Sequence, residues 1–352
     1  MHVPLTPHVN ATWAAMGRSL GTSSTKDEDI ALNEKLNALR NRIVVMIGDS
    51  TLRNQFLQLV RIGLAFPRDL SVAKTISMRN YQGSFSLPGA ARLQSERPDS
   101  SNAFWGGFPW MVATTPSNTT FAYAKLWGCS DVHNVLRRIK GAMIRHGQRE
   151  REHRCWPPDL VLWNFGLHLL HVYPARPVAT SAIRCAMTYK SLLQASARAL
   201  RAHLPYAKLF YRSTNAVCDE RFDGAWAVAR HAHHCALPTQ AASVQACQSE
   251  RIARLQLGCQ QRYNISRGAC AATFMDNANS RSQHETARIL FSKKPGEVHL
   301  FDAFTFTQGR CDATVDGRHY PRLLAAINQC FLVRAAQALG SSHPGIQRRT
   351  LG

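Results

Sequence analysis

The sequence of 352 residues contains no apolar run of the roughly 18 to 20 residues that a membrane-spanning helix needs. Its first stretch, MHVPLTPHVNATW, has no charged start followed by an apolar core, so it lacks the pattern of a secretory signal. No internal repeat is visible, and no two cysteines have the CxxC spacing of a zinc site. With 45% hydrophobic residues, the chain is instead typical of a soluble globular protein.

Acidic residues are also scarce: 22 Asp and Glu stand against 43 Lys and Arg, which gives a formal net charge of +21. The basic residues are scattered, apart from short clusters such as RRIK at 137–140 and RHGQREREHR at 145–154. Aromatic residues are not interleaved with them, as a base-stacking surface would require. We therefore expect a basic solvated surface and no nucleic-acid partner, with an acidic polysaccharide or anionic membrane surface as the second interpretation.

Ten cysteines lie between Cys129 and Cys330, and sequons for N-glycosylation occur at Asn10, Asn118 and Asn264. Together these features predict the lumen of the secretory pathway, either the Golgi or the secreted state. We expect at least two disulfides, mostly within residues 214–295; a bond between Cys311 and Cys330 is one of the pairings that the sequence allows. A signal or membrane anchor would then lie outside the given residues.

Hydrophobic periodicity predicts strands that alternate with helices over most of the chain. Expected strands are 43–47, 120–127, 159–166, 207–213 and 296–304; expected helices are 27–40, 51–64, 131–144, 181–203 and 319–337. Residues 68–118 are rich in Gly, Ser and Pro and are expected to be loops with short extended pieces. Such alternation is typical of an α/β fold, a three-layer α/β/α sandwich with a mostly parallel sheet. We assign a polar segment and lead-in helix to 1–39, the main domain to 40–335 with a cysteine-rich insertion at about 214–295, and a tail to 336–352.

The carboxyl ends of parallel strands are where an α/β protein gathers its functional groups. In this sequence the first strand runs into Gly48-Asp49-Ser50, and the strand at 159–166 ends with Asn164. The last strand is followed by RCDATVDGRHYP, in which Asp316 and His319 are three residues apart. A serine, an asparagine and an Asp-x-x-His pair are thus all predicted to lie at one edge of the sheet.

These residue types suit acyl transfer. A serine hydroxyl becomes a good nucleophile only when a base accepts its proton, and a histidine titrates in the right range for that role. A carboxylate then orients the imidazole, and an Asp three residues before the His can meet it on one helical turn. The oxyanion of the intermediate needs donors, which the Ser50 backbone N–H, a loop glycine and the Asn164 amide could supply.

The motif GDSTLRNQF resembles the GDSxxRNQ motif of the PC-esterase families, which include the trichome-birefringence-like polysaccharide O-acetyltransferases within the SGNH (GDSL) hydrolase superfamily. LVLWNFGLH resembles the motif that carries the superfamily's Asn, and DATVDGRHYP resembles its final Asp-x-x-His motif. The resemblance covers roughly residues 40–335. It implies Ser50 as the nucleophile, His319 as the base, Asp316 as the residue that orients it, and Asn164 as an oxyanion donor.

The same resemblance implies a second-motif glycine in the oxyanion hole, for which Gly83 in NYQGSF is the first choice; the alternatives are Gly106, Gly107 and Gly128. Asp49, Arg53, Asn54 and Gln55 are expected to support the nucleophile loop rather than react. The expected partners are a glycan acceptor and an acetyl donor, and neither a cofactor nor a metal is expected. The chain has DGRHYP in place of the DCSHWCLPG ending of the plant enzymes, so xylan and pectin do not follow as its substrates.

Simpler interpretations exist for each residue. Ser50 could merely cap the helix that follows, and Asn164 could be an ordinary turn residue. His168 and His171 are further candidate bases, but they lack an Asp at suitable spacing, and HAHHC at 231–235 has no matching ligand cluster. Two function classes remain: an O-acetyltransferase or acetylesterase, and a non-catalytic carbohydrate-binding relative with the same fold.

Overall fold

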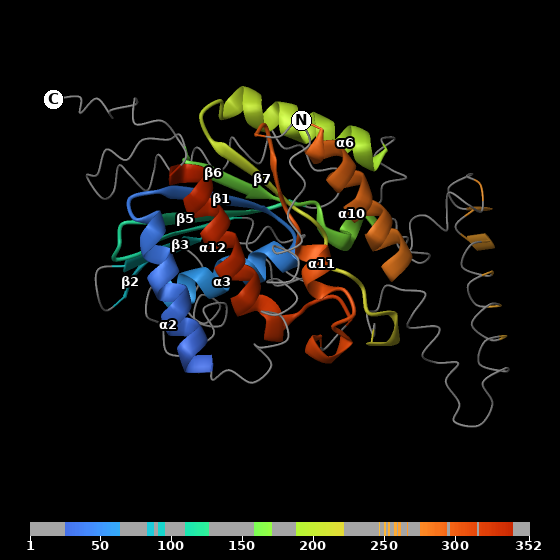
Figure 1. Ribbon diagram of the computed structural model, residues 1–352, viewed down its shortest axis with the longest axis horizontal. Coiled ribbons are helices and arrows are strands. Elements are labelled where there is room, and N and C mark those ends of the chain that lie inside the picture. The colour runs from blue at the N-terminus through green and yellow to red at the C-terminus, as the bar shows by residue number, and fades with distance from the viewer. Residues whose placement is uncertain are drawn as a thin grey trace.

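The computed structural model describes residues 25–63, 83–87, 91–95, 110–126, 158–170, 188–221, 275–293, 296–314 and 317–340, with isolated positions between 246 and 266. Within these ranges the chain forms an α/β structure around one mixed sheet (Figure 1). Its strands are β1 (Ile43–Gly48), β2 (Gly83–Leu87), β3 (Ala91–Ser95), β4 (Trp110–Thr114), β5 (Thr120–Lys125), β6 (Leu160–Trp163), β7 (Lys208–Arg212) and β8 (His299–Phe301).

The sheet order is β2-β3-β4-β5-β1-β6-β7-β8. Strands β5, β1, β6, β7 and β8 are parallel neighbours, and β4 joins β5 in antiparallel register. These six strands make the mostly parallel part of the sheet, which β3 and β2 extend in antiparallel fashion. The mostly parallel α/β sheet is thus confirmed, and β1 lies inside it with a neighbour on each side.

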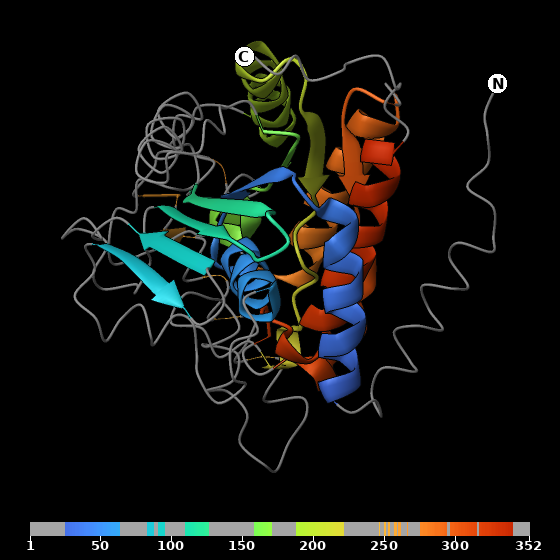
Figure 2. The same cartoon turned by 90° about the vertical axis from the view of Figure 1, so that its left-hand side faces the viewer.

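Helices cover both faces of this sheet. The helices are α2 (Thr25–Leu36), α3 (Ser50–Gly63), α6 (Tyr189–His203), α10 (Asn277–Ser292), α11 (Ala303–Thr307) and α12 (Leu324–Gly340), with short 3₁₀ turns η1 (Asn37–Leu39), η3 (Gly166–Leu170), η4 (Asp219–Arg221), η5 (Cys311–Ala313) and η6 (Pro321–Leu323). Val44 and Met46 of β1 pack with residues of α2, α3 and α12, whereas Val45 and Ile47 pack with residues of α6 and α10. Figures 1 and 2 show α2 and α12 side by side.

This two-faced burial explains why β1 has an uninterrupted apolar sequence. Every residue of β1 is buried, so neither face of the strand can carry a polar residue at low cost.

The flanking helices begin where the sequence offers a capping side chain: Thr188 accepts from the Ser191 amide before α6, and Asp276 accepts from the Asn279 amide before α10.

Two regions gain detail in the structure. The short extended pieces expected within residues 68–118 are the strands β2, β3 and β4, which build the antiparallel part of the sheet. Within the expected insertion, Asn277–Ser292 is helix α10, whose Ala287 and Phe291 join the core beside β6 and β7. The helix expected at 131–144 lies outside the described residues.

The C-terminal helix is both long and apolar. By length and composition, Pro321–Gly340 is the one stretch among the described helices that could cross a membrane, and half of it is buried within the protein. Its side chains Ile327, Phe331 and Leu332 belong to the core cluster that also contains β1 residues. In this fold the segment therefore acts as a core helix against the sheet.

Candidate active site

The turn between β1 and α3 is organised by Asp49, not by Ser50. The Asp49 carboxylate is 1% exposed, and its Oδ1 accepts hydrogen bonds from the Thr51 amide at 2.9 Å and the Leu52 amide at 3.4 Å. It also accepts from the Thr51 hydroxyl at 2.6 Å. Asp49 is thus the N-cap of α3. The interpretation of Ser50 as the helix cap is wrong, and its hydroxyl is free for another contact.

That contact is with His319. Ser50 Oγ lies 2.8 Å from His319 Nε2, a hydrogen bond between residues 269 positions apart in the chain. Both side chains are partly buried, so the pair is shielded but reachable. A serine hydroxyl within hydrogen-bond distance of an imidazole nitrogen has the geometry of a nucleophile and its general base.

The Ser50 backbone N–H is also available. In the described part of the chain it has no acceptor, whereas the Thr51 amide is held by the cap and the Arg53 amide donates to the Asp49 carbonyl at 2.9 Å. The first amides of a helix carry the positive end of its dipole. An oxyanion formed beside Ser50 Oγ would therefore meet an unsatisfied donor.

Two glycines allow the ends of β1 and β6 to approach each other closely. A Cβ on Gly48 would lie 2.0 Å from Asn164 Oδ1, and a Cβ on Gly166 would lie 1.8 Å from Asp49 Oδ2. Gly166 also has φ of +61°, which disfavours any other residue. The GDS pattern drew attention to Gly48 in the sequence. Gly166 was not predicted to have a role, although its place two residues after Asn164, at the end of a strand, indicated a turn.

Asn164 lies beneath the turn and is completely buried. Its Oδ1 accepts from the Asp49 amide at 3.2 Å, while its Nδ2 donates over longer distances to the Thr51 hydroxyl at 3.3 Å and to Asp49 Oδ1 at 3.4 Å. From the other side, the Tyr123 hydroxyl donates to the Gly48 carbonyl at 2.9 Å. Asn164 thus contacts Asp49 and Thr51, the residues on either side of Ser50, and in this arrangement it holds the nucleophile turn.

The loop that carries His319 is held through three consecutive carbonyls. The Gly317 carbonyl accepts from the Cys218 amide at 2.7 Å, and the Arg318 carbonyl accepts from Asn215 Nδ2 at 2.9 Å. The His319 carbonyl accepts from the Thr314 hydroxyl at 2.6 Å. These bonds fix the backbone on which the imidazole stands. Residues 317–320 are not helical, and Asp316 lies outside the described residues, so its expected contact with His319 stays a prediction.

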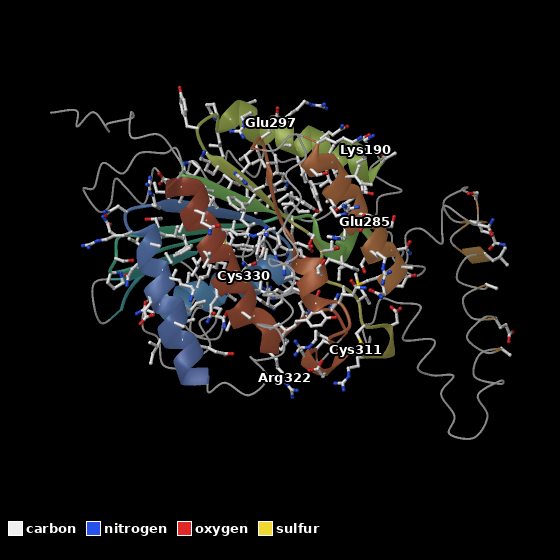
Figure 3. The ribbon with its side chains drawn as sticks, in the orientation of Figure 1. Lys190, Glu285, Glu297, Cys311, Arg322 and Cys330 are labelled. Atoms are coloured by element: carbon white, nitrogen blue, oxygen red, sulfur yellow. A yellow bond between two sulfur atoms is a disulfide. The ribbon has the colours of Figure 1, made fainter. Side chains whose placement is uncertain are left out.

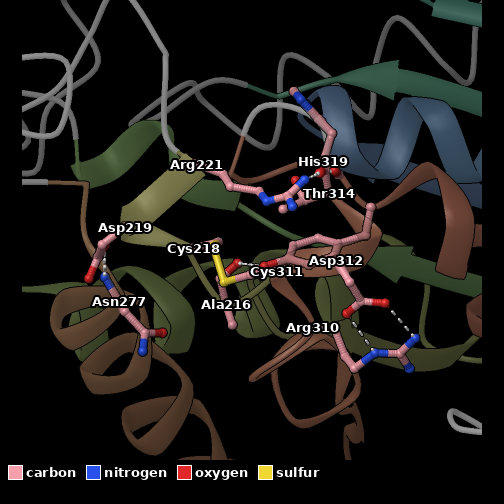
Figure 4. The surroundings of a disulfide bond; sticks show 11 residues. Ala216, Cys218, Asp219, Arg221, Asn277, Arg310, Cys311, Asp312, Thr314 and His319 are labelled. Atoms are coloured by element: carbon pink, nitrogen blue, oxygen red, sulfur yellow. Dashed lines mark hydrogen bonds and ion pairs between the residues drawn. A yellow bond between two sulfur atoms is a disulfide. The ribbon is translucent and has the colours of Figure 1, made fainter. Parts of the chain in front are cut away.

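A disulfide between Cys218 and Cys311 closes the same region, as Figure 4 shows beside Thr314 and His319. It joins the segment after β7 to the segment that leads to the His319 loop. The pairing of Cys311 with Cys330, one of those that the sequence allowed, is not formed: Cys330, labelled on α12 in Figure 3, is a free buried thiol. Burial raises the pKa of this thiol to about 11. The remaining cysteines lie outside the described residues, so the number of disulfides stays a prediction.

Two cationic side chains flank the nucleophile turn on the β5 side. Lys125 is the partner of Gly48 in the β1–β5 register, and burial, followed by the charge of Arg53, lowers its pKa to about 8. The Nε of Arg53 is buried and has no hydrogen-bond partner among the residues that the structure describes. Arg53 and Asn54 both lie in the first turns of α3, where the sequence predicted supporting residues.

Other predicted residues are not brought together with Ser50 by the described structure. Gly83 begins β2, which is four strands away from β1 in the sheet order, or roughly 19 Å at ordinary strand spacing. Asp316 and the alternative glycines Gly106, Gly107 and Gly128 lie outside the described residues, as do His171 and the HAHHC motif. Among the described residues no group of three His, Cys, Asp or Glu could hold a metal.

The arrangement can activate a serine hydroxyl, accept its proton and donate a backbone hydrogen bond to an adjacent oxyanion. Residues that the sequence did not single out, Tyr123 and Thr314 among them, hold the turn and the loop. Their signal was weak, because a hydroxyl in a strand or loop is common. No protein-family model and no curated protein matches the chain.

Proposed function

We propose that the protein is a serine-dependent acyl-transfer enzyme of the SGNH hydrolase type, related to the PC-esterases. The observation that carries the proposal is the 2.8 Å hydrogen bond between Ser50 Oγ and His319 Nε2 at the carboxyl end of the central strand. The capping of α3 by Asp49 supports the proposal further, because Ser50 is then not needed to begin the helix.

In the proposed reaction, His319 Nε2 takes the hydroxyl proton while Ser50 Oγ attacks the carbonyl carbon of an acetyl ester. The ester C–O bond breaks, the leaving oxygen takes the proton from His319, and acetyl-Ser50 remains. Water or a sugar hydroxyl then attacks this intermediate, with His319 again as base, and Ser50 is regenerated. Both the O-acetyltransferase and the acetylesterase use these steps and differ only in the acceptor.

The developing oxyanion would be bound by the Ser50 amide, with Asn164 Nδ2 as the second donor. The distances of 3.3 and 3.4 Å that join this Nδ2 to its present acceptors are long for hydrogen bonds, so its donor capacity is only weakly used by the turn. Asp316 is proposed as the residue that orients His319 on the strength of the sequence motif alone.

We propose a glycan hydroxyl as the acceptor and a secretory compartment as the site of action. The disulfide supports an oxidising compartment. The sequon residue Asn118 lies in the turn between β4 and β5, where its Nδ2 donates to Asn41 Oδ1 in an exposed hydrogen bond of 2.9 Å.

The test is to trap the acyl-enzyme. The protein is incubated with an acetyl ester, and peptide mass spectrometry locates the acetyl group. We expect the label on Ser50, and we expect Ser50→Ala and His319→Ala each to lower kcat on the order of 10⁴-fold or more, with the double variant little worse. His203, exposed near the end of α6, is the control histidine.

Label on another serine, or full activity of Ser50→Ala, would refute the catalytic assignment. A folded protein that binds glycans and never acquires label from any donor would instead support the carbohydrate-binding alternative. Asp316→Asn should keep the fold and lower kcat strongly, because the imidazole would lose its orienting carboxylate.

A further inference from the structure

A fully buried arginine lies between the nucleophile helix and the base loop. Arg212 is the last residue of β7 and is 1% exposed. Its Nε donates to Gln55 Oε1 at 3.1 Å, and its Nη1 donates to the Thr51 hydroxyl at 3.3 Å and to the Ser213 carbonyl at 3.1 Å. Its Nη2 donates to Asn215 Oδ1 at 2.7 Å. The guanidinium thus uses all three nitrogens.

Burying this positive charge costs free energy, and the hydrogen-bond acceptors of the guanidinium are all uncharged. In the described structure no carboxylate accepts from Arg212; its opposite charge is Asp49, which acts through space. Burial lowers the pKa of Arg212 to about 10, so the side chain is still a cation at neutral pH. Apolar residues of similar volume usually stabilise a core as well or better. Arg212 therefore has a role other than filling the core.

Its contacts connect the two halves of the candidate site. On one side Thr51, the residue after Ser50, and Gln55 hold the guanidinium to the first turns of α3. On the other side Asn215 accepts from Arg212 and donates from its own Nδ2 to the Arg318 carbonyl at 2.9 Å. Arg318 directly precedes His319. One chain of hydrogen bonds thus runs from the residue after the nucleophile to the residue before the base.

We infer that Arg212 is a positioning residue, which sets the α3 turn that carries Ser50 against the loop that carries His319. Its planar fork can satisfy acceptors from both segments at once, and an ammonium or an apolar side chain cannot reproduce that geometry. The kinetic consequence of this role rests on the proposed function, whereas the geometric consequence does not.

Three variants test the role. Arg212→Met removes the guanidinium but keeps much of the apolar stem. Asn215→Asp keeps an acceptor for Arg212 and removes the donor to the Arg318 carbonyl. Arg334→Met is the control, since Arg334 is partly buried and joins α12 to the Leu300 carbonyl at 2.9 Å in another part of the fold.

With p-nitrophenyl acetate as substrate, Arg212→Met is expected to lower kcat on the order of 100-fold while KM changes little, since misplacing catalytic groups by about 1 Å has such an effect. Asn215→Asp should also lower kcat, but by a smaller factor than Arg212→Met does. Arg334→Met should lose thermal stability without loss of kcat. Equal effects of Arg212→Met and Arg334→Met on kcat would overturn the inference. So would a wild-type kcat in both Arg212→Met and Asn215→Asp. If Arg212→Met does not fold, the kcat of Asn215→Asp alone decides.

A readout independent of turnover separates this inference from the proposed function. In protein labelled with ¹⁵N-histidine, the His319 ring signals are assigned by comparison with His319→Gln. Ser50→Ala should shift them through loss of the hydrogen bond, and Arg212→Met should shift them in the same direction. Unchanged ring signals in folded Arg212→Met would refute the positioning role, even in an enzyme of unknown substrate. Absence of turnover in the wild type would refute only the proposed function.

Discussion

Replacing Asp49 by Asn provides a direct measure of how the nucleophile turn is stabilised. Asn is as good a helix N-cap as Asp, so the substitution keeps the acceptor for the Thr51 and Leu52 amides and removes only the charge. Arg212 then remains buried and loses Asp49, the carboxylate that acts on it among the described residues. Removing one member of a buried charge pair costs about 3–5 kcal/mol. Because the two charges here are not in direct contact, we expect the lower end, about 3 kcal/mol.

Asp49→Ala removes the cap as well and should cost about 1 kcal/mol more than Asp49→Asn. Ser50→Ala is the matched control at the next position: its hydroxyl makes one partly buried hydrogen bond, to His319, so its loss should cost no more than about 1.5 kcal/mol. The assay is equilibrium unfolding in urea, followed by circular dichroism, with unchanged m-values as the condition for comparison. If Ser50→Ala proved more destabilising than Asp49→Ala, the assignment of Asp49 as the cap would be wrong.

Three further predictions concern stability. The double variant Cys218→Ala/Cys311→Ala opens a link between residues 93 positions apart, and the chain-entropy relation gives a loss of about 4–5 kcal/mol, measurable as a lower urea midpoint. Gly166→Ala introduces a Cβ at 1.8 Å from a buried carboxylate oxygen at a positive φ and should cost more than about 3 kcal/mol, whereas Gly309→Ala, with φ of +72° and open space around its Cβ, should cost about 1–2 kcal/mol. Lys125 has a pKa of about 8 in the folded state against 10.5 as its ordinary value, so between these pH values the unfolded state binds more protons and stability rises with pH. From pH 8 to 10.5 the melting temperature of the wild type should therefore rise relative to that of Lys125→Met. A difference in melting temperature that stays constant over this range would contradict the lowered pKa.

Local sequence patterns determined most of the elements near the site. The apolar run at 43–47 predicted β1, and amphipathic spacing after Ser50 predicted α3, because each segment must bury one or both of its faces wherever it lies. The alternation of strands and helices also predicted a mostly parallel sheet. That topology placed Ser50, Asn164 and the region of His319 at one edge before any contact was known.

The antiparallel part of the sheet was not predictable in the same way. Strands β2 and β3 alternate polar and apolar residues over only five positions each, in a region rich in Gly, Ser and Pro, so the pattern alone did not show with which strands they pair. For the same reason Gly83 could be matched to a motif by its neighbours in sequence, although the strand order separates it from β1.

The tertiary structure alone decided which polar groups meet. Ser50 and His319 are 269 residues apart, and Arg212 contacts Gln55 across 157 residues, so no local pattern could reveal either pair. The sequence showed that Asp49 and Ser50 stand together on a turn, but only the fold decided that the carboxylate caps the helix and the hydroxyl faces the imidazole. The reason is physical: local periodicity reports which face of a segment is buried, whereas a hydrogen bond depends on distances that are set when all the segments pack.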